Sequence, residues 1–180
     1  MKLVSWNVRG LNKAYKQKEF KLFLKNNSIC LIAVLEHRVK EHNATKIISK
    51  FGRGWGWCHN YQYSSRGRIW ILWDPNYICY NMVSMSEQYI HGSVSIHKLN
   101  LLFNLTVVYG SHTIDDRRRL WAELRSLYHT QQGPWAVMDD FNTIMSAEDR
   151  QGGSPVQEVE TRDFCEYLLD TGMAEMKSIG

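Results

Sequence analysis

The sequence predicts an α/β fold in which mixed β-sheets are flanked by helices. Three observations support this class. The chain opens with buried strand-like runs that alternate with helical stretches, its middle is a series of short strand-like runs, and its last third adds one more buried strand and two helices. Neither an internal repeat nor a linker interrupts the pattern. We therefore interpret residues 1–180 as a single domain.

The N-terminal part is predicted to be a parallel strand-helix-strand unit. Leu3–Trp6 has the pattern of a strand, and Lys13–Lys25 follows with its apolar residues at helical spacing and its lysines on the opposite face. Ile29–Leu35 is a continuous apolar run, as expected of a strand buried on both faces. A shorter helix is predicted at Asn43–Phe51, where glycines follow and end it.

The middle of the chain changes to short runs rich in β-branched and aromatic residues, separated by turn residues such as Asp74, Pro75 and Asn76. The runs are Trp55–Tyr63, Arg68–Trp73, Tyr80–Ser86, Gly92–His97 and Leu102–Val108. Because these strands are so close in sequence, we expect consecutive ones to pair as antiparallel hairpins.

The last third is predicted to contain a helix, a strand and a second helix. Asp115–Tyr128 carries an apolar stripe beside three arginines, Arg117–Arg119, which we interpret as a solvated helix face rather than a phosphate-binding patch. Pro134–Met138 is a buried strand, and Val156–Leu169 has apolar residues at helical spacing.

Composition places the chain among globular proteins, with 44% apolar and 22% charged residues. The net charge of +4 permits contact with a polyanion without requiring it. We see no N-terminal signal segment and no apolar stretch of membrane-spanning length, so we expect an intracellular protein without a membrane partner. The widely spaced Cys30, Cys58, Cys79 and Cys165 are predicted to be free thiols in the core.

Polar side chains follow three of the predicted buried strands. Asn7 comes after the first, Glu36 after the second, and Asp140 with Asn142 after the late strand. Strand ends of this kind converge in α/β proteins even when they are distant in sequence. If the segment after the late strand is extended, Asp140 and Asn142 face the same side and Phe141 points into the core.

These residue types suit phosphodiester hydrolysis. The reaction needs a hard cation, and Mg²⁺ prefers one or two carboxylates plus water, so Glu36 is the natural ligand. A second carboxylate, for which Asp140 is the candidate, must orient or deprotonate the attacking water. The amide of Asn142 can hold that carboxylate or the phosphate by donating a hydrogen bond.

Five short motifs in this sequence occur in the order seen in the exonuclease-endonuclease-phosphatase superfamily. They are Trp6–Asn12, Leu35–Val39, Gly67–Trp70, Val107–Gly110 and Asp140–Asn142. The chain most closely resembles the endonuclease domains of plant LINE-type (non-LTR) retrotransposons, a likeness to which Arg68–Pro75 and Asp149–Gly153 contribute.

The resemblance implies a DNase I-like, four-layered α/β sandwich that nicks DNA in a metal-dependent reaction, acting in the nucleus. It implies that Glu36 binds Mg²⁺, assisted by Asn7, with Mn²⁺ as a second candidate. It further implies that Asp140 activates or orients the water, and that Tyr109 and Asn142 help to hold the scissile phosphate.

Two arginines within these motifs are the predicted substrate-binding residues. Arg9 lies in the first motif, and Arg38 occupies a position where the family often has Lys or Arg. The chain also departs from the family pattern twice, with His37 where Thr is usual and Asp139 where Gly is usual. The second change adds negative charge beside Asp140.

The Ser-Asp-His motif that ends the superfamily's pattern has no counterpart in these 180 residues. We therefore expect a domain truncated at its C-terminus, with weak or no activity and with an unpaired sheet edge that favours self-association. Two alternatives stay open. One is a noncatalytic nucleic-acid-binding or interaction module on the same fold, and the other is a phosphatase that acts on small phosphoesters.

Overall fold

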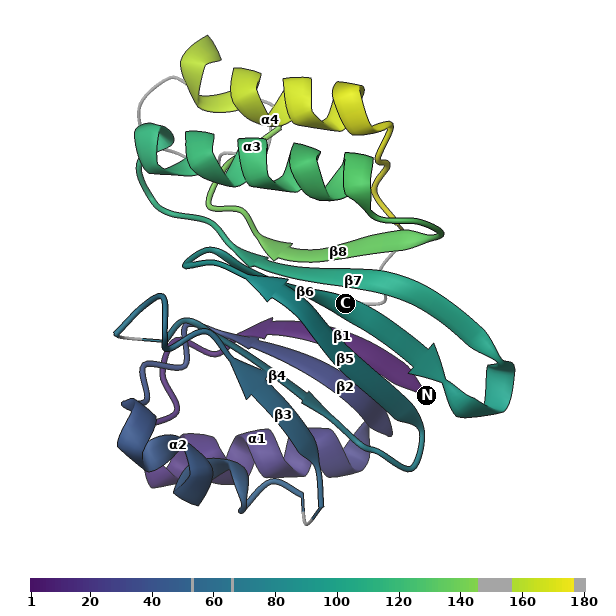
Figure 1. Ribbon diagram of the computed structural model, residues 1–180. Helices are drawn as coiled ribbons and strands as arrows, with labels where there is room; N and C mark the ends of the chain where they lie inside the picture. The colour runs from purple at the N-terminus through teal and green to yellow at the C-terminus, as the bar shows by residue number, and fades with distance from the viewer. Residues whose placement is uncertain (53, 66, 146–156, 177–180) are drawn as a thin grey trace. The chain divides into compact units, whose positions relative to one another are not determined.

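A computed structural model describes residues 1–52, 54–65, 67–145 and 157–176, except for the side chain of Asp139. The chain divides into two compact units (Figure 1). The first consists of Met1–Tyr109 with Gln132–Asp140, and the second of Gly110–Gln131 with Phe141–Gly180. The single-domain interpretation stays a prediction.

The first sheet of the first unit is mixed and has four strands. In spatial order they are β1 (Lys2–Asn7), β2 (Ile29–Leu35), β4 (Ile69–Trp73) and β3 (Gly56–His59). The β1 and β2 strands are parallel, whereas β4 is antiparallel to both of its neighbours. Every residue of β2 is buried, as its continuous apolar run predicts.

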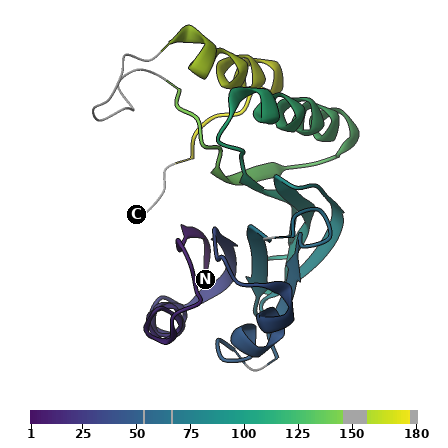
Figure 2. The ribbon, with the colours of Figure 1, turned by 90° about the vertical axis from the view of Figure 1, so that its left-hand side faces the viewer.

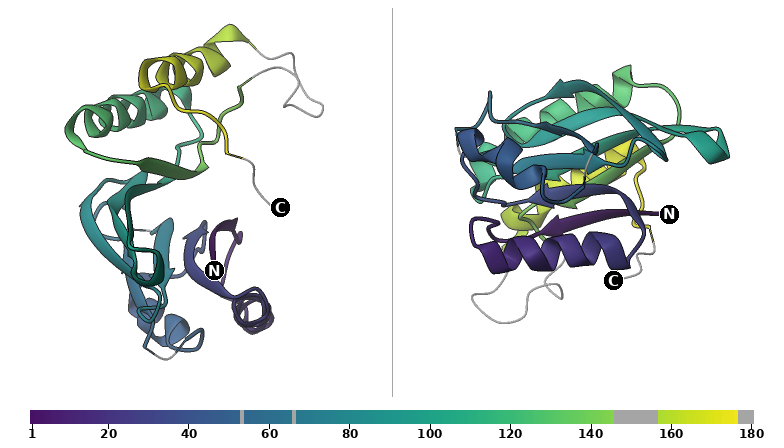
Figure 3. Two further views of the ribbon diagram at one scale, coloured as in Figure 1. Left: turned by 90° about the vertical axis from the view of Figure 1, so that its right-hand side faces the viewer. Right: turned by 90° about the horizontal axis from the view of Figure 1, so that it is seen from below.

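Two helices cover one face of this sheet, as Figure 1 and the right-hand view of Figure 3 show. They are α1 (Ala14–Asn26) and α2 (Glu41–Ile48). Their apolar stripes, including Phe20 and Ile47, form one core with Val34 of β2 and Trp70 of β4. The amphipathic spacing predicted from the sequence therefore corresponds to this helix-sheet interface.

The second sheet of the first unit is also mixed. In order it contains β5 (Ile78–Met85), β6 (Tyr89–Ile96), β7 (Leu101–Tyr109) and β8 (Trp135–Asp140), with a 3-10 turn at His97–Leu99 between β6 and β7. Only β7 and β8 are parallel. Apolar residues of both sheets, such as Ile71 and Val107, form a second buried core between them (Figure 2). The predicted α/β class with mixed sheets and helices is confirmed.

Strand pairing differs from the hairpin prediction at one place. Three consecutive pairs, β3 with β4, β5 with β6 and β6 with β7, are antiparallel as predicted. The prediction is wrong between β4 and β5, because the turn at Asp74 leads the chain from the first sheet into the second. The β5 strand is an outer strand, and a bulge at Val83 interrupts its register with β6. Such a bulge disfavours pairing with another edge.

The second unit contains α3 (Ile114–Thr130) and α4 (Glu158–Thr171). The two helices contact each other through an aromatic cluster, in which Trp121 lies 5.3 Å from Phe164 and 5.4 Å from Tyr167 between ring centroids. The interpretation of residues 117–119 as a solvated face is wrong for Arg117. This side chain is 5% exposed and donates hydrogen bonds to the carbonyls of Ser111 and His112.

Two further predictions from composition can be compared with the structure. All four cysteines are free thiols, but the core interpretation is wrong for Cys79, which is exposed on β5. None of the helices in the described part of the chain has the length and apolar character needed to cross a bilayer. The predicted helix Val156–Leu169 starts at a residue that lies outside the described ones. The whole Asp149–Gly153 motif also lies outside them.

Candidate active site

The carboxyl ends of two parallel strand pairs carry four of the predicted site residues. Asn7 is the last residue of β1 and lies opposite Leu35 of β2, so that Glu36 follows directly. In the second sheet, Tyr109 ends β7 and lies opposite Asp140, the last residue of β8. Each sheet thus contributes a pair of polar groups from the same ends of its parallel strands.

A hydrogen bond joins the two sheets at these ends. The amide nitrogen Nδ2 of Asn7 donates to Oδ2 of Asp140 at 2.5 Å, across 133 residues of sequence. The other amide atom, Oδ1 of Asn7, accepts the main-chain N–H of Arg9 at 3.3 Å. A partly buried carboxylate held by an amide donor has a fixed orientation, and such charge-assisted bonds are stronger than neutral ones. Asn7 therefore orients Asp140.

Glu36 lies in a loop that the main chain holds on both sides. Its N–H donates to the carbonyl of Arg68 at 2.9 Å, and its carbonyl accepts the N–H of Gly10 at 2.9 Å. The Glu36 carboxylate forms an ion pair with the guanidinium of Arg38. The hydrogen bond that Arg38 donates to Glu36 within this pair raises the pKa of Arg38, and the charges of Glu36 and Tyr109 raise it by smaller amounts. The Arg38 side chain is 63% exposed and that of Glu36 is 19% exposed, so solvent screens the pair.

Glu36 and Arg38 are presented together because the residue between them is anchored in the core. His37 has no exposed surface and stacks on Trp70, with ring centroids 3.9 Å apart. Its Nδ1 accepts the N–H of Val39 at 3.1 Å. Burial, and to a lesser extent His59, lowers the pKa of His37 to about 3, so the ring is neutral. His37 is thus an internal anchor for the loop.

Left-handed backbone conformations shape the two loops that meet here. Glu36 has a φ of 52° and Arg38 a φ of 54°, and Arg9 in the facing loop has a φ of 46°. Such values are uncommon outside glycine and cost free energy that the surrounding contacts must offset. Lys16 contributes one such contact, because its Nζ donates to the carbonyls of Val8 and Arg9 at 3.1 Å.

Tyr109 lies against a cation that the motif analysis did not assign to the site. The tyrosine is 3% exposed, and its N–H donates to the carbonyl of Gln88 at 2.9 Å. The guanidinium of Arg68 lies over its ring, 5.2 Å from the centroid. In the sequence, Arg68 belongs to the Gly67–Trp70 motif and to a predicted strand, and neither gives an indication of its partner.

Asn60 is a second residue that the sequence did not single out. Its side chain is fully buried, and its Oδ1 accepts the N–H groups of Arg68 and Ile69 at 3.2 Å. Its Nδ2 donates to the carbonyls of Ser86 at 3.2 Å and Glu87 at 2.8 Å. One buried amide therefore ties the start of β4 to the turn between β5 and β6. Burying an amide is favourable only when it is hydrogen-bonded in this way.

Asn142 belongs to the second unit. The expectation of an extended segment after the late strand is wrong, because β8 ends at Asp140 and Asn142 has a φ of 50°. Its Nδ2 donates to the carbonyl of Gly110 at 2.6 Å. Phe141 is 8% exposed and lies 4.7 Å from Phe164 between ring centroids, so its predicted burial is confirmed. Gly110 has no room for a side chain, since a Cβ there would lie 2.2 Å from the Phe141 carbonyl oxygen.

In the first unit, the Glu36 carboxylate and the Asn7 amide are side chains suited to a hard cation. Within the described residues, no three His, Cys, Asp or Glu side chains gather as a closed metal cage. Mg²⁺ does not require such a cage, since it is usually bound by one or two carboxylates and keeps several waters. Glu36 is partly exposed and its charge partner is an exposed arginine, a donor arrangement that fits this mode of binding.

Comparison with solved structures identifies the fold. The endonuclease domain of TRAS1, a telomere-specific non-LTR retrotransposon, matches with a TM-score of 0.68 and 9% identity, covering 94% of this chain and 71% of that chain. An endonuclease/exonuclease/phosphatase family protein from Bacteroides thetaiotaomicron matches with a TM-score of 0.57 and 11% identity. The mannosyl-6-phosphatase of the same organism matches with a TM-score of 0.57 and 9% identity.

The chain therefore has the fold of the endonuclease/exonuclease/phosphatase proteins. It covers 62% and 65% of the two Bacteroides chains, in each case over 78% of its own length. A scan of protein-family models gave no match, and a search of curated proteins also gave none. At identities near one in ten, the structural likeness establishes the fold, and the chemistry must be argued from the site.

Proposed function

We propose that this chain is a metal-dependent phosphodiesterase that nicks DNA, an endonuclease of the retrotransposon type. The observation that carries the proposal is the Asn7–Asp140 hydrogen bond, which places an oriented carboxylate at the end of β8. Glu36 directly follows β2 of the first sheet, and Tyr109 ends β7 of the second sheet of the same unit. A carboxylate for a cation, a second for water and a phenol for phosphate are the groups that phosphodiester hydrolysis requires.

Glu36 and Asn7 are the proposed ligands of Mg²⁺, with Mn²⁺ as a second candidate. The bound cation would neutralise charge that develops on the non-bridging phosphate oxygens. Asp140, whose orientation Asn7 fixes, accepts a proton from the attacking water or orients it. In this proposal, the amide of Asn7 contributes to both carboxylate sites, because it binds the cation together with Glu36 and donates a hydrogen bond to Asp140.

The remaining residues hold the phosphate in this proposal. The Tyr109 hydroxyl donates a hydrogen bond to a phosphate oxygen. Arg38, from the loop of Glu36, and Arg9, from the facing loop, supply positive charge. Asn142 is the other proposed phosphate ligand. DNA is the proposed partner, and the nucleus the proposed location, because chromosomal DNA is the target of such a nicking reaction.

A second candidate function is hydrolysis of small phosphoesters. The mannosyl-6-phosphatase from Bacteroides thetaiotaomicron has this fold, and its name indicates a sugar phosphate as substrate. The same carboxylates and phenol serve either a monoester or a diester. A small phosphoester needs few contacts beyond the reacting phosphate, whereas DNA binding depends on cations that contact neighbouring phosphates.

The test is nicking of supercoiled plasmid in Mg²⁺, with EDTA as the metal-free comparison. Wild type should produce open circles only with metal. Glu36→Gln should remove this activity, and Asp140→Asn should reduce it to a slow residual rate. Glu19→Gln, an exposed change on α1, is the matched control and should nick like wild type.

Three outcomes would contradict the endonuclease proposal. Nicking that survives Glu36→Gln would place the activity elsewhere. DNA retardation without nicking by wild type would support a noncatalytic binding module. Release of phosphate from mannose 6-phosphate without nicking would support the phosphatase.

A further inference from the structure

Arg68 is fixed in position through its main chain on both sides. Its N–H donates to Oδ1 of the fully buried Asn60 at 3.2 Å, and its carbonyl accepts the N–H of Glu36 at 2.9 Å. Its Cα therefore cannot move without disturbing either the start of β4 or the loop of the proposed metal ligand. A guanidinium presented from such a position is already oriented before any ligand arrives.

The Arg68 side chain is half-buried and lies over the ring of Tyr109, 5.2 Å from the centroid. A guanidinium that lies over an aromatic ring makes a cation-π contact, and the N–H donors along its edge can bind a further partner. That edge is the part of arginine that binds phosphate oxygens in bidentate fashion.

Arg68 also differs from five of the other described arginines in its charge partners. Arg38, Arg118, Arg119, Arg125 and Arg162 each form an ion pair with a carboxylate. For Arg68, in contrast, no carboxylate of the described residues lies within ion-pair distance. A cation that has lost part of its hydration without gaining a counter-ion is costly, and an anionic ligand would offset this cost.

We propose that Arg68 is a substrate-binding residue whose guanidinium donates to a non-bridging oxygen of the phosphate held at Tyr109. This inference rests on the proposed function, since it takes a phosphodiester as the ligand. It adds a residue from the first sheet to a phosphate site that otherwise consists of Tyr109 and loop arginines. Arg68 would contribute mainly to affinity, because it lies over Tyr109 and its own contacts include neither proposed carboxylate.

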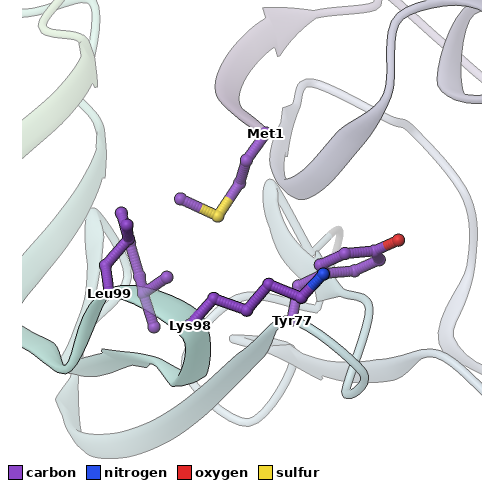
Figure 4. Close-up of a pocket in the computed structure, with 5 residues that line it drawn as sticks. Met1, Tyr77, Lys98 and Leu99 are labelled. Atoms are coloured by element: carbon purple, nitrogen blue, oxygen red, sulfur yellow. The ribbon is translucent and has the colours of Figure 1, made fainter.

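The chain offers a matched control at the other end of β7. Lys98 lies over the ring of Tyr77, with Nζ 5.6 Å from the centroid, in a shallow pocket that Met1 and Leu99 also line (Figure 4). Lys98 precedes β7 and Tyr109 ends it, and β7 has nine residues. At about 3.3 Å per residue, the two cation-aromatic pairs are therefore roughly 25 to 30 Å apart. A change at Lys98 removes a comparable pair without touching the proposed phosphate site.

The experiment is equilibrium binding of the full chain to a fluorescent DNA duplex, by anisotropy, over a range of salt concentrations. Ca²⁺ replaces Mg²⁺ so that binding is measured apart from nicking. Arg68→Met should weaken binding about tenfold or more and reduce the slope of log affinity against log salt by about 0.9. Arg68→Lys should restore the slope and only part of the affinity, because a lysine keeps the charge without the planar fork. Lys98→Met should change neither quantity.

An Arg68→Met slope equal to that of wild type and of Lys98→Met would overturn the inference. If Arg68→Met does not fold, wild type itself provides the answer through labelling with phenylglyoxal, read by mass spectrometry. DNA should slow the modification of Arg68 but not of Arg119, and equal rates with and without DNA would also overturn the inference. The same experiments distinguish a failure of the proposed function from a failure of the role proposed for Arg68. Arg68-dependent binding without nicking contradicts only the nuclease, and nicking with an unchanged slope contradicts only the role of Arg68.

Discussion

Lowering the pH should destabilise the folded chain through His37. This ring is completely buried against Trp70, and burial lowers its pKa from 6.5 to about 3. In the unfolded chain the ring is free to take up a proton near its ordinary pKa. The unfolded state therefore binds more protons than the folded state as the pH falls below about 6.5, and the free energy of unfolding decreases with it. The loss continues until the pH approaches about 3, where the folded state also becomes protonated.

The size of the effect follows from the two pKa values. One pKa unit corresponds to about 1.4 kcal/mol. About pH 5 lies roughly 1.5 units below the ordinary pKa of 6.5, so the unfolded ring is protonated there, whereas the folded ring, with a pKa of about 3, is still neutral. His37 alone should thus remove about 2 kcal/mol of stability between about pH 7 and about pH 5. Burial also lowers the pKa values of His59 and His91, so these histidines add losses of the same sign.

The assay is urea unfolding, followed by tryptophan fluorescence at a series of pH values, for wild type and His37→Asn. Asparagine can accept the Val39 N–H in place of Nδ1 but does not titrate. The variant should start less stable and lose about 2 kcal/mol less than wild type over this range. His129→Asn, at an exposed position of α3, is the control and should follow wild type. Equal pH dependence in wild type and His37→Asn would refute the assignment of His37 as a buried neutral anchor.

Three further changes probe the loop, the link between the sheets and the second unit. Arg38→Ala should tighten Mn²⁺ binding about three- to tenfold by calorimetry, because it removes a positive charge that competes for Glu36. Asn60→Ala should lower the free energy of unfolding by about 3 kcal/mol in urea titrations, since it leaves buried main-chain groups of β4 without partners. Gly110→Ala should cost about 2 kcal/mol or more in the same titration, because its Cβ would collide with the Phe141 carbonyl.

A different result would contradict each of these three predictions. Mn²⁺ affinity that is unchanged by Arg38→Ala, or changed as much by Arg119→Ala, would show that the ion pair does not oppose the cation. A loss below about 1 kcal/mol for Asn60→Ala would mean that water or a shifted backbone satisfies the same groups. Wild-type stability of Gly110→Ala would mean that the Phe141 segment can move aside.

The elements of this fold were largely predictable because their apolar patterns are strong. The Ile29–Leu35 strand has the predicted bounds, since an unbroken apolar run of this length has few other structures available. The α1 helix was predicted to within one residue at each end for a similar reason. The division of the middle strands into two sheets was not predictable, because the alternation within β4 and β5 gives no information on which sheet each strand joins.

The part of the candidate site that lies at strand ends could be predicted from the sequence. The convergence of Asn7 with Asp140 follows from placing both at the carboxyl ends of parallel strands, and the structure brings them into hydrogen-bond contact. Asn60 and Arg68 could not be predicted, because their importance comes from partners on other strands. The burial of Arg117 is a similar case, since local spacing cannot reveal that two loop carbonyls accept its hydrogen bonds.

The most direct test of the central claim is single-turnover plasmid nicking by a double-mutant cycle on Asn7 and Asp140. If the amide acts by orienting the carboxylate, Asn7→Ala should slow nicking strongly in wild type and very little in an Asp140→Asn background. The double variant should therefore nick at nearly the rate of Asp140→Asn alone. Losses that simply multiply would show that the two residues act independently and would contradict the proposed site.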